Sequence, residues 1–526
     1  MKLDRKEMKM KKRKMIIGMP LLAGLLMAGF AWAEEAPPVF PLGAAASKPA
    51  TAPVATTTVA MKEAPAAPAV TPAKEAPAVP ATAPVPTAVP TAPATPATPA
   101  APEAVIAPAA PAPTVNAGDT AWILASAALV MLMTPGLAFF YGGLVRRKNV
   151  LSILMQCMII LCIVSLQWVL IGYSLSFGPD IKGFIGSLSW FGLNGVGLEP
   201  HSVYATTAPH QAFMIFQAMF AVITPALIIG AFAERVKFIP FCIFTLLWST
   251  LVYDPVCHWV WADKGLLGTF GGMGALDFAG GTVVHINAGM AALAAALFLG
   301  KRLGYPNKMS PPHNLPFAVL GAGLLWFGWF GFNAGSALAA NGLAVSAFVV
   351  THVATAAAGL AWAIMDLIFN KRSTVLGIIT GAVAGLVAIT PASGFVTPMG
   401  AILLGLGAGV ICYISVSFCK AKFGYDDTLD AFGVHGVGGI WGALATGLFA
   451  TKLVNSGGAD GLFYGNPAQL LIQIKAVLIT MVYSFVLSYI LFWIVDKIFG
   501  LKADEHCERV GLDLTEHREA AYTTLE

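Results

Sequence analysis

The sequence predicts an all-α, polytopic membrane protein with eleven transmembrane helices, arranged as two inverted five-helix repeats followed by a final helix. The first observation is the composition: of 526 residues, 57% are hydrophobic and only 11% are charged, whereas soluble domains carry about 25% charged residues. The second is that apolar runs near the roughly 20 residues needed to span a bilayer recur from about Ala121 to Gly500. The third is that Lys and Arg are concentrated in every second loop between these runs.

The N-terminal region, 1–33, has the three parts of a secretory signal peptide. Residues 1–14 are basic, residues 15–30 are apolar, and Ala31-Trp32-Ala33 is a small-residue cleavage site. An uncleaved anchor helix is the alternative, and in both cases the next residues begin outside the membrane. Residues 34–118 consist mostly of Ala, Pro, Thr and Val without a periodic apolar face. They predict a disordered periplasmic tether.

The remaining sequence divides into a transmembrane domain, 119–500, and a C-terminal tail, 501–526. Twelve Lys and Arg residues follow odd-numbered spans, against four after even-numbered spans or at the entry of the last one. The positive-inside rule therefore predicts an inner-membrane protein with a periplasmic N-terminus and a cytoplasmic C-terminus. The predicted spans are 120–144, 150–177, 210–232, 238–256, 279–299, 316–336, 343–369, 374–391, 399–419, 431–452 and 470–499.

Two matched sets of ionisable residues lie in the spans, where such groups are costly and indicate functional sites. Asp277 and His285 in the fifth span are eight positions apart, as are Asp427 and His435 in the tenth, and a glycine follows each histidine at the fourth position. Because the two sets are five spans apart, two five-span repeats must have opposite orientations. Transporters use inverted repeats with a site at their interface. Pseudo-symmetry then predicts that the histidines lie side by side near the bilayer centre.

Other interpretations of these groups must be weighed. A lone histidine in a span is more typical of a satisfied core residue, and two neutral imidazoles without a third ligand make a poor zinc site. The seven cysteines lack paired spacing, so neither a metal, a cofactor nor a disulfide framework is predicted. No basic face is interleaved with aromatic residues, which gives nucleic-acid binding no support. Neutral imidazoles can pass hydrogen bonds and protons, which suits a small polar solute in a dry pore.

Aromatic residues near these groups are candidates for a cation-binding vestibule. A cation over an aromatic ring gains about 2 kcal/mol or more once it is desolvated. Taken singly, each aromatic residue is more typical of helix packing than of a site, so the pattern alone is only suggestive. The candidates are Phe216 and Phe220 in span three, Trp261 beyond span four, and Trp329, Phe332 and Ser336 in span six.

Several stretches resemble signatures of the ammonium transporter family, the Amt/Mep/Rh group, and in particular its bacterial Amt branch. The motifs are long and occur in the expected order over about 119–526. They are Thr134-Pro-Gly-Leu-Ala-Phe-Phe-Tyr-Gly-Gly143, Asp277-Phe-Ala-Gly-Gly-Thr-Val-Val-His-Ile-Asn-Ala-Gly289, Gly328-Trp-Phe-Gly-Phe-Asn-Ala-Gly-Ser336, Phe432-Gly-Val-His-Gly-Val437 and Glu508-Arg-Val-Gly-Leu-Asp-Leu514.

The resemblance implies a homotrimer with one pore per subunit, which captures NH4+, deprotonates it near a gate and conducts NH3, with the proton carried separately. It also implies a cytoplasmic partner, a PII-type signalling protein. Whether methylammonium is accepted, and whether transport is electrogenic, is left open. The implied residue roles are recruitment by Phe216, Phe220, Trp261 and Ser336; a gate of Phe220 and Phe332; a pore with His285, His435 and Trp329; and structural or electrostatic support from Asp277 and Asp427.

Two features depart from the family pattern, and four rival functions are considered. Ala431 occupies a pore-wall position where a larger aliphatic residue is expected, and the Ala/Pro tether has no counterpart. A built-in sensor would need an output domain, but only 26 residues follow Gly500. A neutral gas channel of the Rh type does not need the recruitment set. A hydrolase needs an activated nucleophile or an open metal site, and neither is evident, so no enzyme activity is predicted. A scaffold does not need matched acids and histidines.

Overall fold

The computed structural model describes residues 114–308 and 310–522, all of which belong to one unit, 105–526. The predicted signal peptide, 1–33, and the predicted tether up to residue 113 lie outside the described residues. The first span begins at Ala117, two positions before the predicted domain boundary. Asn116 caps it by accepting a hydrogen bond from the backbone N–H of Asp119 at 3.0 Å.

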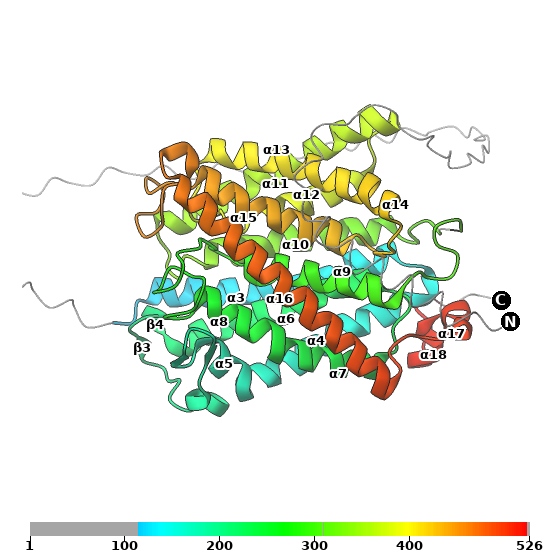
Figure 1. The fold of residues 1–526 in the computed structure, drawn as a ribbon, viewed down its shortest axis with the longest axis horizontal. Coiled ribbons are helices and arrows are strands. Elements are labelled where there is room, and N and C mark those ends of the chain that lie inside the picture. Colours follow the sequence, from blue (N-terminus) through cyan, green and yellow to red (C-terminus); the bar gives the residue numbers. More distant parts are fainter. Residues whose placement is uncertain (1–113, 309, 523–526) are drawn as a thin grey trace, which may run out of the picture. The chain divides into compact units, whose positions relative to one another are not determined.

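The described ranges contain ten helical segments that are long and apolar enough to cross a membrane, together with one shorter apolar helix, α12. These eleven segments confirm the predicted number of spans, and the helices form one bundle in Figure 1. In chain order they comprise α3 (Ala117–Leu144), α4 (Val150–Gln167) with α5 (Tyr173–Phe177), α6 (His210–Phe232), α7 (Phe238–Trp248) with α8 (Asp254–Trp261), α9 (Asn287–Leu299), α10 (Leu315–Gly335), α11 (Gly342–Asn370), α12 (Val375–Ile389), α13 (Pro398–Ile414) with α14 (Lys420–Phe423), α15 (Val437–Phe449) and α16 (Pro467–Phe499).

Several spans are interrupted by a π-helical turn, a feature that is frequent at functional sites. Three of these turns join consecutive helices: η2 (Trp168–Gly172) joins α4 to α5, η4 (Ser249–Tyr253) joins α7 to α8, and η6 (Ser415–Cys419) joins α13 to α14. Two others, η5 (Gly281–Ile286) and η7 (Phe432–Gly436), precede α9 and α15. The last two turns carry the matched histidines at equivalent positions of the two inverted repeats.

Helices α3 and α10 begin the two repeats and pack closely against each other. A Cβ atom added to Gly321 would overlap the backbone N of Phe140, and one added to Gly328 would lie 2.6 Å from the carbonyl oxygen of Leu129. Small residues allow such close approach between helices in lipid. Gly323, in contrast, has nothing within 4 Å of an added Cβ, so only part of the Gly321-Ala322-Gly323 stretch serves this contact.

The end of the bundle that carries the strands, here the strand end, has two short antiparallel ribbons in the loop after the second span. β1 (Asp180–Ile181) pairs with β2 (Ile185–Gly186), and β3 (Pro200–His201) pairs with β4 (Ala205–Pro209) (Figure 1). A 3-10 segment, η3 (Leu188–Leu193), connects the two ribbons. This small β content was absent from the all-α prediction because segments of two to five residues have too short a pattern to recognise.

The opposite end, here the tail end, carries the C-terminal helices α17 (Glu505–Val510) and α18 (Leu512–His517), drawn in red in Figure 1. Their side chains and backbone bind the short loop that contains η1 (Arg147–Asn149). Asp513 Oδ1 accepts from the backbone N–H of Ser152 at 2.8 Å, and Asn149 Oδ1 accepts from the backbone N–H of Leu512 at 2.8 Å. The tail is therefore an ordered part of this end, at least as far as residue 522.

Candidate functional site

Asp277 and Asp427 each cap the start of one interrupted helix. Asp277 Oδ1 accepts hydrogen bonds from the backbone N–H groups of Gly280 and Gly281 at 2.8 and 2.7 Å, and Oδ2 accepts from Thr282 at 2.8 Å and Val283 at 3.1 Å. The first turn of a helix leaves such donors without intrahelical partners, and a negative charge there is favoured by the helix dipole. The carboxylate of Asp277 is therefore directed at its own backbone.

The second cap repeats this arrangement in the other half of the chain. Asp427 Oδ1 accepts from the backbone N–H of Ala431 at 3.1 Å, and Oδ2 accepts from Phe432 at 2.8 Å and Gly433 at 3.4 Å. The equal spacing from aspartate to histidine in the two repeats thus corresponds to equivalent local geometry. Each cap fixes the π-helical turn that follows, and with it the place of a histidine.

The two histidines come together at the crossing of these turns. The imidazole rings of His285 and His435 are stacked, with centroids 5.5 Å apart and an angle of 15° between their planes. A Cβ on Gly289 would overlap the Cα of Gly436, so the glycine one turn after His285 is what permits this approach. The sequence had suggested that these side chains are neighbours, and the structure places them side by side.

The histidine pair lines a small, mostly apolar space. Among the described residues, neither nitrogen of His285 nor Nδ1 of His435 has a hydrogen-bond partner, although both side chains are buried. A narrow cavity lies against the two side chains. Apart from the two histidines its walls are apolar, formed by Met133, Leu137, Ile223, Leu227, Val284, Leu325, Trp329 and Phe332.

A pair of phenylalanine rings lies next to this cavity. Phe220 and Phe332 have ring centroids 4.3 Å apart, and Phe216 contacts Phe220 edge-on at 4.9 Å. Trp329 stacks on His285 with centroids 5.3 Å apart, and its indole N–H donates to Thr390 Oγ1 at 2.8 Å. The two rings of Phe220 and Phe332 are both fully buried, so they close the space between them.

A hollow at the strand end lies beyond these rings, and the predicted orientation makes it the outer vestibule. Trp261, Asp277 and Ser336 line it. Phe220 contacts Trp261 edge-on at 5.6 Å, which joins the vestibule to the phenylalanine pair. The Ser336 hydroxyl donates to the carbonyl oxygen of Phe332 at 2.9 Å, which leaves its oxygen lone pairs available.

A second hollow opens at the tail end, and the predicted orientation makes it the inner vestibule. His435 lines both this hollow and the apolar cavity, so it stands between the two. Lys420 and Asp430 form an ion pair of 2.6 Å in its wall. The predicted residues thus follow one path: Trp261, the phenylalanine pair, the apolar cavity with His285, and then His435.

Sequence reasoning missed several residues of this path. Phe177, Tyr204 and Phe213 form an aromatic cluster that lines the outer vestibule. Tyr204 lies in the loop between two predicted spans, and no periodic pattern marks such positions. Thr390 was missed because a threonine at the end of a span gives no signal of its partner.

Ala431 follows the cap of Asp427 and lies against α6. The Ala431 side chain is 2% exposed. A Cβ atom added to Gly230 of α6 would lie 3.0 Å from the Cβ atom of Ala431. The small residue at this position thus fits beside a glycine of the neighbouring helix, which is a packing reason for the departure from the expected larger side chain.

At its centre the path offers hydrogen-bonding nitrogen atoms between apolar walls. In the part of the chain that the structure describes, no group of three or more His, Cys, Asp or Glu side chains could hold a metal ion. The path is narrow, apolar at its centre and polar at both ends. Its central polar atoms are imidazole nitrogens, which accept or donate hydrogen bonds without carrying a charge.

Comparison with known proteins gives a consistent result. A model described as the Ammonium Transporter Family matches residues 121–522. The ammonium transporter of Bacillus subtilis is 53% identical over 405 residues, covering 77% of this chain and 98% of that protein. The ammonium transporter Amt1 of Archaeoglobus fulgidus is 48% identical over 406 residues, covering 77% of this chain and 99% of that protein.

Solved structures show the same similarity. The crystal structure of Saccharomyces cerevisiae Mep2 has a TM-score of 0.69 at 36% identity, covering 74% of this chain and 91% of that chain. A structure described as a sensor Amt protein has a TM-score of 0.69 at 33% identity, covering 76% of this chain and 98% of that chain.

Proposed function

Because this chain belongs to the ammonium transporter family and is an ammonium transporter, we propose that it captures NH4+ in the outer vestibule and passes NH3 between two histidines. The proton leaves near the phenylalanine gate and travels by a separate route. The observation that carries this proposal is the stacked pair of buried imidazoles with unpartnered nitrogens, located between an apolar cavity and the inner vestibule.

Capture rests on the aromatic lining of the outer vestibule. Trp261 and Phe220 meet edge-on at 5.6 Å, and a desolvated cation on such rings gains about 2 kcal/mol or more. The Ser336 oxygen can accept a hydrogen bond from the cation, since the hydroxyl proton is already donated to Phe332. Asp277 lines the same hollow but is occupied by its four backbone donors. It adds negative potential rather than a direct contact.

Deprotonation follows from the cost of moving a cation past the gate. The cavity beyond the phenylalanine pair is apolar except for neutral imidazoles, and an unpaired charge in such surroundings costs far more than a neutral polar molecule. NH3 can instead exchange hydrogen bonds with the free nitrogens of His285 and His435 as it moves. Trp329, fixed by Thr390, keeps His285 in its stacked position.

The direct test is the current across a supported membrane that carries reconstituted protein, measured after an ammonium pulse. We expect His285→Ala combined with His435→Ala to abolish the current or its selectivity for ammonium. His352→Ala is the matched control, because His352 also lies in a span but faces outward from α11. We expect it to keep the wild-type signal.

Other outcomes of this experiment discriminate between mechanisms. A wild-type protein without current, but with ammonia-driven pH changes in vesicles, would indicate neutral conduction. A folded double mutant whose current and ammonium selectivity are unchanged would contradict the proposed role of the histidines. Methylammonium as the pulsed solute tests whether the vestibule accepts a substituted cation.

We further propose the assembly and environment that the family resemblance implies: a homotrimer in the inner membrane, with a cleaved signal peptide, a periplasmic N-terminus, a cytoplasmic tail and a PII-type signalling protein bound at the tail end. The concentration of Lys and Arg in loops of the tail end supports the orientation. Native mass spectrometry tests the trimer and the cleavage. Labelling of an introduced cysteine at Lys371 from either side tests the orientation.

A further inference from the structure

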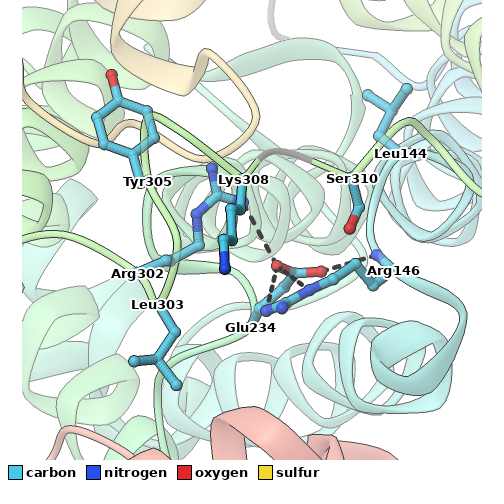
Figure 2. A pocket seen from close by; sticks show the side chains of 8 residues that line it. All are labelled: Leu144, Arg146, Glu234, Arg302, Leu303, Tyr305, Lys308 and Ser310. Carbon is cyan, nitrogen blue, oxygen red and sulfur yellow. Dashed lines mark hydrogen bonds and ion pairs between the residues drawn. The ribbon is translucent and has the colours of Figure 1, made fainter.

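A separate pocket lies at the tail end, outside the path through the gate and the histidines (Figure 2). It is built by the loops after the first, third and fifth spans. The proposed transport steps do not use it. Its polar lining consists of Arg146, Glu234, Arg302, Tyr305, Lys308 and Ser310.

The single carboxylate in this lining is already engaged. Glu234 Oε1 accepts from the backbone N–H of Arg146 at 2.7 Å, and Oε2 accepts from Arg146 Nε at 2.9 Å. The Arg302 guanidinium approaches the same oxygen at 3.4 Å, as Figure 2 shows. With its side chain only 3% exposed, Glu234 holds two cations in place and has little capacity for a further one.

Arg302 is also held from its other side. Its Nε and Nη2 donate to Asp426 at 3.0 and 2.9 Å, and Asp426 accepts from the buried Arg235 at 2.9 Å. The guanidinium is 10% exposed and is fixed by two carboxylates. It therefore presents an oriented positive edge to the pocket without moving.

The pocket and its supports have an excess of positive charge. Lys308 has no carboxylate partner among the described residues. The hydroxyl of Tyr305 donates to the carbonyl oxygen of Tyr425 at 3.0 Å, so it is not free. Among the side chains that line the pocket, the cations Arg146, Arg302 and Lys308 outnumber the carboxylate Glu234 by two.

We propose that this pocket binds a phosphate group, with Lys308, Arg302 and Arg146 supplying the opposing charge and Ser310 a hydroxyl donor. A phosphate monoester carries about −1.5 to −2 charges at pH 7, which matches the excess of two. Guanidinium groups fixed in place are well suited to phosphate oxygens, and lysine binds them as a point charge. The ligand is a soluble phosphate-bearing molecule or the headgroup of a phospholipid.

An occupant of this pocket would lie against the wall of the inner vestibule. Leu144, Arg302 and Ser310 line both hollows. A bound phosphate would therefore contact residues at the mouth of the pathway while leaving its central histidines untouched. The inference does not depend on the proposed transport steps, because binding is measured without an ammonium gradient.

The experiment uses full-length protein in nanodiscs of phosphatidylcholine. Inorganic phosphate and ATP are titrated by calorimetry as soluble probes, and nanodiscs that contain phosphatidic acid, analysed by native mass spectrometry, provide the lipid probe. We expect saturable binding of either a soluble probe or the lipid probe. Lys308→Ala should weaken it at least about tenfold, because one charge-assisted contact is lost. Lys308→Arg should restore most of the affinity.

The matched control is Lys301→Ala, since Lys301 lies in the same loop with its ammonium 5.7 Å from the Tyr305 ring centroid and does not line the pocket. Unchanged binding in this control, together with weaker binding in Lys308→Ala, supports the site. The probe that shows this pattern identifies whether the phosphate belongs to a soluble molecule or to a lipid headgroup. Absence of saturable binding for all three probes overturns the proposal. Equal weakening by both substitutions also overturns it, because that result indicates attraction to a diffuse positive surface.

Discussion

At the scale of single residues, the most informative side chains are those with buried polar atoms that lack a partner. In the described ranges both nitrogens of His285 and Nδ1 of His435 are in this state. Each such atom costs about 1–3 kcal/mol, so a packing role alone would favour apolar side chains at both positions. The proposed passage of a solute that exchanges hydrogen bonds would give both imidazoles a partner, which packing does not.

Thr390 supports this pair from behind and gives a residue-scale prediction. Thr390→Val keeps the shape of the side chain but removes the acceptor of the Trp329 indole N–H, which lies at 2.8 Å. A buried donor left unpaired costs about 1–3 kcal/mol. We expect lower thermal stability and a several-fold slower ammonium-driven signal. Thr390→Ser retains the hydroxyl and should stay close to wild type; equal loss in both variants would contradict the role of the hydrogen bond.

Single residues also show what the sequence could and could not predict. The spacing of Asp277 and His285 repeats at Asp427 and His435, and this repetition was enough to predict that the histidines are neighbours. The partner of Trp329 could not be predicted, because Thr390 is 61 positions away and nothing local indicates the contact. The pocket around Lys308 was likewise invisible, since its cations appeared only as loop charges that set the orientation.

At the scale of helices, the interrupted spans depend on their aspartate caps. Asp427→Ala removes the carboxylate that accepts hydrogen bonds from three backbone N–H groups. These hydrogen bonds are buried and charge-assisted. We expect a loss of roughly 3 kcal/mol or more of stability, seen as a lower unfolding temperature and lower yield. Asp427→Asn keeps one acceptor oxygen, so its unfolding temperature should lie between those of the wild type and Asp427→Ala. An unfolding temperature unchanged in the alanine variant would show that the cap is dispensable.

The crossing of the two interrupted helices gives a second prediction at this scale. Gly289→Ala places a Cβ atom against Gly436, so the helices must separate and the imidazoles move apart. We expect loss of transport in protein that still inserts into the membrane. Gly323→Ala is the control, because nothing lies within 4 Å of its added Cβ. Alanine is favoured over glycine in a helix by about 1 kcal/mol, so transport and stability should be kept or improved. Wild-type transport by Gly289→Ala protein would show that transport does not depend on this close approach of the two helices.

The spans themselves were predictable because apolar runs of this length have no other stable environment. All eleven predicted spans correspond to helical segments, whereas some ends differ: the fourth span continues past residue 256 to Trp261 through α8, which follows the π-helical turn η4. Such turns leave no mark in hydropathy, since they change the hydrogen-bond step and not the residue types. The short ribbons of the strand end were not predicted because segments of two to five residues have too short a pattern to recognise.

At the scale of the whole molecule, an ion-pair network joins the loops of the tail end, and a hydrogen bond beside it joins these loops to the docked tail. Glu508 accepts from the backbone N–H of Leu303 at 2.9 Å, beside the network of Glu234, Arg302 and Asp426. This end combines charges from both repeats and from the tail, so its stability reports on the assembly of the whole bundle.

The pH dependence of stability follows from the two carboxylates of this network. Burial alone would raise the pKa of Glu234, but hydrogen bonds and the charges of Arg146 and Arg302 outweigh it and lower the pKa. The pKa of Asp426 is lowered in the same way, with burial opposed mainly by Arg302. A carboxyl group whose folded pKa is depressed stabilises the fold above its unfolded pKa, and this contribution is lost as pH falls through the folded pKa.

Thermal unfolding in detergent between about pH 7 and pH 3 tests this expectation, because unperturbed carboxyl groups titrate near pH 4. From these two groups we expect no change between about pH 7 and pH 5, and a falling unfolding temperature below about pH 4. Glu234→Gln should be less stable at neutral pH and lose less on acidification, since it lacks one of the titrating groups while Arg146 loses its carboxylate partner and Arg302 keeps only Asp426. Parallel curves for wild type and variant would show that Glu234 does not contribute to acid sensitivity, and that the tail end is held by packing and neutral hydrogen bonds instead.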